Sequence, residues 1–219
     1  MSSVNFAVKC GVIAFAVSGI VAALLAFAEP AFSGDADDAT ASNPGVLRPV
    51  SAFEKIGDNN LRAVALFEEA GKVIQSPRCM NCHPATDRPT QTDKLRPHQP
   101  PAFRGEGGVG PPGGLACISC HPAANFDAAR VPGHPQWRLA PAEMAWQGRT
   151  LGQICVQIKD PSRNGGKDMP ALIKHVSEDS LVGWAWSPGA ERTPAPGTQK
   201  EFGALIKAWA AAGASCPKS

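Results

Sequence analysis

The sequence carries little net charge. Lys and Arg number 21 against 19 Asp and Glu, which gives a formal net charge of +2 at pH 7 over 219 residues. Nucleic-acid-binding domains gather positive charge on one face or along one helix, so this composition gives no support for a nucleic-acid partner. Long regular elements are also scarce, because Gly and Pro make up about a fifth of the chain, well above ordinary usage. The length suits one domain, at most two.

Charge is scarcest at the N-terminus. Lys9 is the only charged side chain in residues 1–28, an uncharged run follows from Gly11 to Ala28, and Ala26-Phe27-Ala28 precedes Glu29. This order is typical of a cleaved secretory signal peptide. The alternative is an uncleaved membrane anchor, since the run is as long as the shortest spanning helices. We expect residues 1–28 to be the signal, 29–48 a flexible leader, and the protein to reside in the periplasm, with membrane contact only if the signal stays uncleaved.

One five-residue pattern occurs twice, as Cys79-Met80-Asn81-Cys82-His83 and as Cys117-Ile118-Ser119-Cys120-His121. A Cys-x-x-Cys-His pentad is the attachment motif of a c-type haem, in which both thiols bind the porphyrin and the His becomes the proximal iron ligand. A single Cys-x-x-Cys is also compatible with a redox dithiol or half of a zinc site. The repeated His and the export signal favour haem, so we expect two covalent haem c groups with His83 and His121 as proximal ligands.

The pentads lie in a chain that resembles the cytochromes c. Apolar residues recur with helical spacing from Leu61 to Ile74, with Asn59 or Asn60 as the expected cap, and Pro77 stops this helix before the first pentad. The segment between the pentads, 84–116, is rich in Pro and Gly and too short for an independent cytochrome domain. We therefore expect a mainly α, cytochrome c-like domain over 49–219, with long Gly/Pro-rich loops and two haems that share one core.

Four cations of the inter-pentad segment are candidates to pair with the haem propionates, although a solvated loop explains them equally well. They are Arg88, Lys94, Arg96 and Arg104.

Three further helices are indicated in the C-terminal half. Capping boxes at Thr150/Gln153 and Thr198/Glu201 precede apolar stripes, and a short helix is expected to begin near Pro170. The first stripe places Cys155 in the core, and the last helix ends at Gly213, just before Cys216. Since four of the seven cysteines hold haem and Cys10 lies in the signal, Cys155 and Cys216 remain for a disulfide, with two separate buried thiols as the alternative.

The second axial ligand of each iron decides between electron transfer and catalysis, because an iron with an open position binds small molecules. Few residues are available. We regard His98 and His175 as the leading candidates and Met144 and Met169 as the sulfur alternatives, with His134 a weaker candidate.

A narrower resemblance lies in the C-terminal half. The stretch from Asp179 to Gly189 and the following Arg192-Thr193-Pro194-Ala195-Pro196-Gly197 resemble small bacterial c-type cytochromes known as an isoquinoline 1-oxidoreductase subunit, over about residues 78–217. Those proteins accompany molybdenum hydroxylases that oxidise aldehydes or N-heterocycles. The resemblance implies an electron-accepting partner subunit, and no molybdopterin or flavin site is visible in this chain.

These features together predict a periplasmic dihaem cytochrome that relays single electrons and is not itself an enzyme. The expected donor is a dehydrogenase, with a molybdenum hydroxylase as one candidate, and the expected acceptor is a cytochrome or oxidase of the respiratory chain. The alternatives are a dihaem peroxidase-like enzyme and a haem-based sensor, each with one open iron. The short spacing of the pentads argues against the peroxidase, whose family resembles two complete cytochrome domains.

Overall fold

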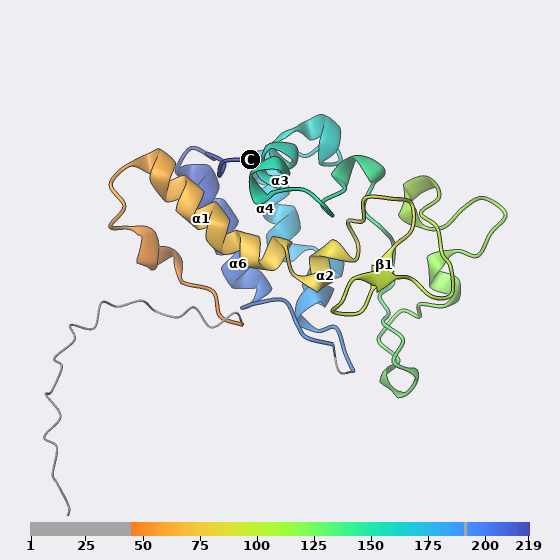
Figure 1. Cartoon of the computed structure of the whole chain (residues 1–219). Coiled ribbons are helices and arrows are strands. Elements are labelled where there is room, and N and C mark those ends of the chain that lie inside the picture. The colour runs from red at the N-terminus through yellow and green to blue at the C-terminus, as the bar shows by residue number, and fades with distance from the viewer. Residues whose placement is uncertain (1–44, 191) are drawn as a thin grey trace, which may run out of the picture. The chain divides into compact units, whose positions relative to one another are not determined.

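The computed structural model describes residues 45–190 and 192–219 (Figure 1). The expected signal segment 1–28 and most of the expected leader lie outside the described residues. The end of that leader differs from the expectation, because Leu47 is only 4% exposed and the Gly45 carbonyl accepts a hydrogen bond from the Gly197 amide. Burial of an apolar side chain fixes this segment, so residues 45–48 belong to the packed part of the chain and not to a flexible leader.

The fold is mainly helical, as expected. The α-helices are α1 (Asn59–Ile74), α2 (Pro77–Met80), α3 (Leu151–Lys159), α4 (Met169–Glu178), α5 (Ser180–Gly183) and α6 (Gln199–Ala211). Two short strands, β1 (Thr90–Gln91) and β2 (Arg96–Pro97), form an antiparallel pair in which Thr90 faces Pro97. The remaining elements are single 3-10 turns. Within the described residues, no helix is both long enough and apolar enough to cross a membrane.

The hydrophobic core lies between the longer helices. Helix α6 packs against α1 and α4, and Figure 1 shows α1 and α6 side by side. At their contact the rings of Phe67 and Trp209 are 4.9 Å apart, and both side chains are fully buried. Aromatic pairs of this kind add to the stability gained by burial alone. The buried stripe expected for the last helix is confirmed, and it consists of Phe202, Leu205, Ile206 and Trp209.

The helix starts follow the sequence signals with two differences. The capping box at Thr150 and Gln153 forms in full at the start of α3. At α6 the Thr198 hydroxyl accepts from the Glu201 amide, but the Glu201 carboxylate bonds the Thr198 hydroxyl instead of the backbone. The cap of α1 is Asp58, whose carboxylate accepts from the Leu61 amide. The expectation of Asn59 or Asn60 was wrong because both residues already lie in the first turn.

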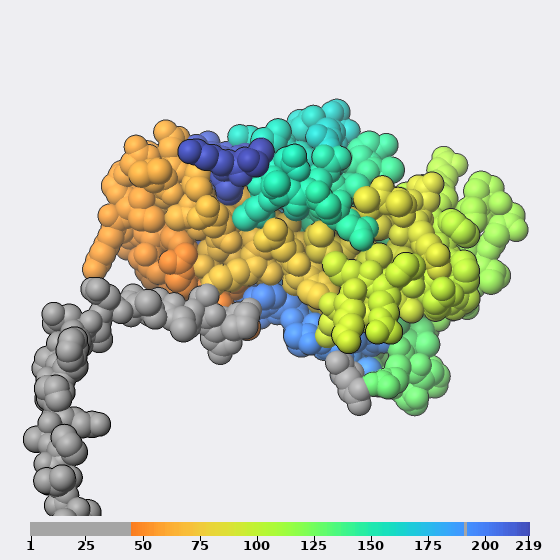
Figure 2. Space-filling view, viewed as in Figure 1, coloured from red at the N-terminus to blue at the C-terminus, as the bar shows by residue number. Residues whose placement is uncertain are grey.

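Between α2 and α3 the chain forms long loops that polar contacts hold together. The buried Arg104 side chain donates to the carbonyls of Pro84, Thr86 and Ala140. In Figure 2 the yellow and green atoms of these loops gather at the end of the described surface away from the orange start of α1. Since buried carbonyls are costly to leave unpaired, Arg104 acts as a structural clamp for the segments around the first pentad.

The expected disulfide is confirmed. Cys155 on α3 is bonded to Cys216 beyond α6, with their Cα atoms 5.6 Å apart and 61 positions between them in the sequence. Cys155 is fully buried in the hydrophobic core. The bond ties the C-terminal tail to α3, and it limits the freedom of the unfolded chain between the two cysteines.

Replacing both cysteines, Cys155→Ala with Cys216→Ala, should lower the free energy of unfolding by about 4 kcal/mol, because the unfolded chain regains the freedom of that loop. Guanidinium unfolding of the variant and the parent at equal haem content measures the difference. A change below about 1 kcal/mol would show that the bond adds little to the stability of the fold.

A buried carboxylate links the start of the domain to α1. The Glu69 side chain is 1% exposed and accepts hydrogen bonds from the Arg48 amide, the Arg48 guanidinium and the Lys72 ammonium at 2.7–2.9 Å. Burial raises the pKa of this carboxyl, but the hydrogen bonds and charges of Lys72 and Arg48 outweigh burial, so the pKa lies below its ordinary value. The ionised form therefore stabilises the fold.

Glu69→Gln should cost about 1–3 kcal/mol at neutral pH, since the amide cannot replace the charge-assisted bonds. The difference should hold above the unfolded-state pKa of about 4.3 and shrink as the pH falls through the lower folded-state pKa, because the parent then loses its ionised carboxylate. Unfolding free energies measured between pH 7 and pH 3 check this dependence. Parallel curves for the two proteins would contradict it.

Candidate functional site

Both pentads adopt helical turns. In the first, on α2, the Cys82 amide donates to the Cys79 carbonyl and the His83 amide to the Met80 carbonyl. In the second, the amides of Cys120 and His121 both donate to the Cys117 carbonyl. Residues three apart on a helical turn lie on the same side, so each turn presents its two thiols together with the histidine just beyond them.

The imidazole of His83 is held from two directions. Its Nδ1 lies 2.7 Å from the Met144 carbonyl oxygen, and its ring stacks on Trp146 with the centroids 3.6 Å apart and the planes 5° from parallel. Burial lowers the pKa of His83 to about 4, and the Met144 carbonyl only partly opposes this. The ring is thus neutral at pH 7, with Nδ1 as donor to the carbonyl and Nε2 as the nitrogen left to bind a metal.

His121 repeats this arrangement with different partners. Its Nδ1 lies 2.8 Å from the Pro132 carbonyl oxygen, and its ring stacks on Trp137 at 4.8 Å. Burial, more than the charges of His98 and Arg192, lowers the pKa of His121. Trp137 in turn meets Trp184 edge to face at 4.8 Å. The second pentad is therefore supported by the C-terminal stretch that contains Trp184.

Asn125 fixes the supporting segments around His121. Its side-chain oxygen accepts from the Gly133 amide and from the Trp184 indole, and its amide group donates to the Ser187 carbonyl. Gly133 follows Pro132, whose carbonyl holds the histidine. A Cβ at Gly133 would lie 2.2 Å from the Pro122 carbonyl oxygen, so the backbone approaches there more closely than a larger residue allows.

Cys79 and Cys82 of the first pentad are half-buried, and their thiols are protonated at neutral pH. Burial raises the pKa of Cys79 to about 12 and that of Cys82 to about 11. For Cys82, the charge of Arg78 opposes the rise and the thiol of Cys117 adds to it, so the two pentads are electrostatic neighbours. Burial also raises the pKa of Cys117. Thiols that act in redox or nucleophilic catalysis show the opposite shift.

His98 lies beside His121. Their ring centroids are 5.9 Å apart with the planes at 60°, and His98 Nδ1 lies 2.8 Å from the Pro100 carbonyl oxygen. The guanidinium of Arg88 donates to the His98 carbonyl at 2.8 Å. Side chain and backbone of His98 are therefore both positioned, and its Nε2 makes no hydrogen bond to any other described residue.

His175 lies on α4, close enough to His83 that a charge on it lowers the pKa of His83. Its Nδ1 is 3.3 Å from a carboxylate oxygen of Asp179, one turn further along. Burial lowers the pKa of His175, although Asp179 opposes this. A carboxylate behind a histidine is a frequent second partner of metal-binding imidazoles.

The other ligand candidates are placed differently. His134 uses both ring nitrogens, since Nδ1 accepts from the Gln136 amide and Nε2 lies 3.1 Å from the Ser180 hydroxyl. The backbone of Met144 holds His83 from the Nδ1 side, and its sulfur lies toward Gly165. Met169 begins α4 and packs against the hydrophobic core.

A cavity of about 970 Å³ adjoins the second pentad. Cys117, Cys120, His121 and His98 line it, together with Cys82 of the first pentad. Trp137 and Trp184 form part of the cavity wall. Residues of β1 and of the loop before α6 form further parts of the wall. Cavities of this size and mixed apolar and polar lining are typical of cofactor sites, and the residues present fit a covalently attached haem.

The four cations expected near propionates divide into two pairs. Arg104 and Arg88 bind backbone carbonyls, whereas Lys94 and Arg96 line the cavity. The sequence reasoning missed Arg78 and Arg192, which also line it, and the stacking roles of Trp146 and Trp137. The position of Arg78 directly before Cys79 was the one available signal.

No group of three or more His, Cys, Asp or Glu side chains in the described ranges converges as an ordinary metal site would. Comparison with protein families, curated proteins and solved structures found no match to this chain.

Proposed function

We propose that this chain is an exported dihaem c-type cytochrome that relays single electrons. The observation that carries the proposal is the common setting of the two pentad histidines. In each, Nδ1 faces a backbone carbonyl and an indole ring stacks on the imidazole, so that Nε2 remains for iron. A repeated arrangement of this kind is expected where two histidines perform the same task.

A second histidine near each pentad histidine favours irons that have no open position for a small molecule. A metal–imidazole bond is about 2 Å long, so two imidazoles on opposite sides of one metal have centroids about 6 Å apart, close to the 5.9 Å between His98 and His121. His175 lies near enough to His83 for its charge to lower the pKa of His83. We therefore assign His98 to the site of Cys117 and Cys120, and His175 to the site of Cys79 and Cys82.

Bound haem supplies a one-electron couple, and the chain's own residues set its surroundings. His83, His121, His98 and His175 would hold the two irons, which would leave no place for a substrate at either iron. The tryptophans exclude water from the imidazoles. Because Cys82 and Cys117 border one cavity, the two haems would lie close enough to exchange electrons inside one domain.

The donor and the acceptor follow from the family resemblance and the expected export. We propose a periplasmic dehydrogenase as donor, with a molybdenum hydroxylase as one candidate, and a soluble cytochrome or the respiratory chain as acceptor. The raised pKa values of Cys79 and Cys82 favour this relay over a dithiol oxidoreductase, which needs a reactive thiolate.

The exported holoprotein should contain two haems per chain, and carbon monoxide should leave the spectrum of the dithionite-reduced protein unchanged, because protein ligands close both irons. A carbon monoxide difference spectrum with haem counted in the same sample measures both quantities. Stoichiometric binding of the gas by one haem would overturn the relay and make the peroxidase-like or sensor alternative the leading account.

His98→Ala and His175→Ala should each open one iron, so each variant should bind one carbon monoxide per chain while it keeps two haems. His134→Ala is the matched control, since His134 uses both ring nitrogens within the protein, and it should behave like the parent. If His98→Ala stays closed to the gas, another residue ligates that iron and the assignment of His98 is wrong.

A further inference from the structure

The wall of the 970 Å³ cavity is strongly cationic. Its lining contains one described carboxylate, that of Asp93, against the cations Arg78, Lys94, Arg96, Arg130, Arg138 and Arg192. Lys94, Arg96, Arg130 and Arg138 are exposed, so solvent screens their charges. Arg78 is buried and Arg192 is half-buried, so the charges of these two arginines are screened less.

Arg78 is the most deeply buried of these cations. Its side chain is 2% exposed, and one terminal nitrogen pairs with Asp93. Its Nε is buried and has no hydrogen-bond partner among the described residues. Burial lowers the pKa of Arg78, although the charge of Asp93 opposes this. A buried guanidinium donor without a partner, at the wall of a cavity, indicates that an acceptor belongs there.

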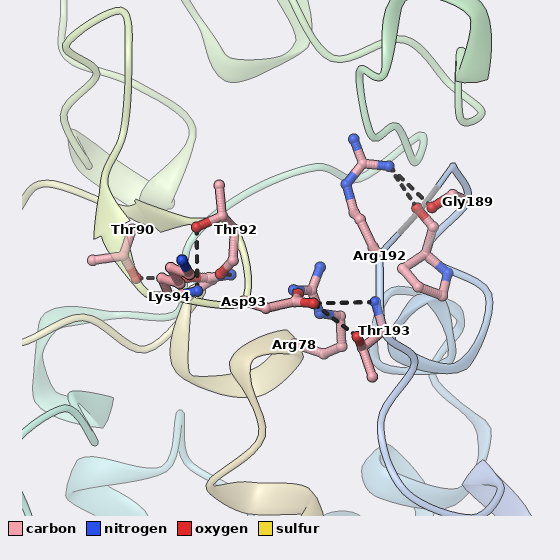
Figure 3. Close-up of polar contacts among 10 residues, drawn as sticks. Arg78, Thr90, Thr92, Asp93, Lys94, Gly189, Arg192 and Thr193 are labelled. Carbon is pink, nitrogen blue, oxygen red and sulfur yellow. Dashed lines mark hydrogen bonds and ion pairs between the residues drawn. The ribbon is translucent and has the colours of Figure 1, made fainter. Parts of the chain in front are cut away.

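Asp93 meets Arg78 with one oxygen only, because its other oxygen accepts from Thr193. That oxygen accepts from the Thr193 hydroxyl at 2.8 Å and from the Thr193 amide at 3.4 Å. Figure 3 shows Asp93 between Arg78 and Thr193, where it ties the loop after β1 to the loop before α6. The link also brings Arg192, the neighbour of Thr193, to the same wall.

Arg192 is held by neutral groups. It donates to the carbonyls of Pro188, Gly189 and Arg130, and Figure 3 shows Gly189 beside Arg192. Burial and then the charge of Arg78 lower the pKa of Arg192, although Asp127 and Asp93 oppose them. Carbonyl groups orient a guanidinium without cancelling its charge, so Arg78 and Arg192 are two neighbouring cations that repel each other.

We propose that Arg78 and Arg192 form a carboxylate-binding site that holds the propionates of the haem attached at Cys117 and Cys120. This inference rests on the proposed function. A guanidinium binds a carboxylate through two parallel hydrogen bonds, and a haem carries two such carboxylates. The attachment cysteines, His121 and His98 line the same cavity as the two arginines, so the anchored end and the acidic end of one haem have partners in one space.

The site has a consequence for electron transfer. A positive charge near iron disfavours the oxidised state, which carries one more positive charge than the reduced state. Arg78 and Arg192 therefore raise the midpoint potential of the adjacent haem. Loss of one of them should lower that potential.

The test uses the holoprotein with Arg192→Gln. We expect two haems per chain, as in the parent, and a fall in one of the two midpoint potentials equivalent to about a tenfold change in the reduction equilibrium, or about 59 mV for a one-electron couple. Lys200→Gln is the control, because Lys200 is exposed and does not line the cavity. It removes the same charge and should leave both potentials unchanged.

Two further variants keep the test decisive. Arg78→Gln removes the other anchor together with its positive charge, and it should also lower one potential. If Arg192→Gln fails to retain both haems, Arg192→Lys replaces it in the test. This variant keeps the charge but loses the paired hydrogen bonds, so the midpoint potential should fall by less than the roughly 59 mV expected for Arg192→Gln. Unchanged potentials in all variants that carry two haems would overturn the site.

A free anion could occupy the same two arginines. The parent is therefore measured in increasing phosphate at constant ionic strength. Potentials that do not respond support bound propionates, whereas potentials that depend on phosphate would show that solvent anions fill the site and would overturn the propionate assignment. A parent protein without covalent haem would instead overturn the proposed function, so the two failures are distinguishable.

Discussion

The hydrogen bond between a histidine Nδ1 and a backbone carbonyl is the contact on which the rest of the site depends. It fixes the tautomer, the direction of Nε2 and the plane of the ring at once. For His83 the acceptor is the Met144 carbonyl, 61 residues further along the chain. The imidazole is therefore oriented only when the segment before α3 has docked on the first pentad. The amides of Trp146 and Gln147, which both donate to the His83 carbonyl, bring the stacking indole with them.

The scaffold that brings these segments together has two parts, which are stabilised by different interactions. Around α1, α3, α4 and α6 it is an ordinary apolar core, closed by the disulfide between Cys155 and Cys216. Around the pentads it consists of loops whose backbone groups are satisfied by buried side chains such as Arg104 and Asn125. Loops of this kind have little apolar surface of their own to bury, so their stability depends on each polar contact and on the cofactor that fills the space between them.

The sequence predicted what depends on local pattern and missed what depends on tertiary contact. The helices carrying Cys155 and Trp209 follow from apolar periodicity and capping residues, and the disulfide follows from counting cysteines. The two pentads can be recognised in the sequence because the spacing of their residues is itself the motif. No local signal shows that Trp146 stacks on His83 or that Arg192 reaches the same wall as Arg78. Arg104 was expected near propionates because it is a cation in the right loop, yet its burial among three carbonyls gives it a structural task.

On the proposed ligand set, the two irons are not equivalent. The second ligand of one, His175, is backed by the Asp179 carboxylate, whereas that of the other, His98, is backed by a neutral carbonyl. A carboxylate makes the imidazole more basic and so favours the oxidised iron. Arg192 lies near enough to His121 for its charge to lower the pKa of His121, and it favours the reduced iron there. Arg104 and Arg138 act in the same way on His83 and His175, so the difference between the two sites rests on the Asp179 carboxylate. The order of potentials is thus set by which charges the fold places behind each histidine.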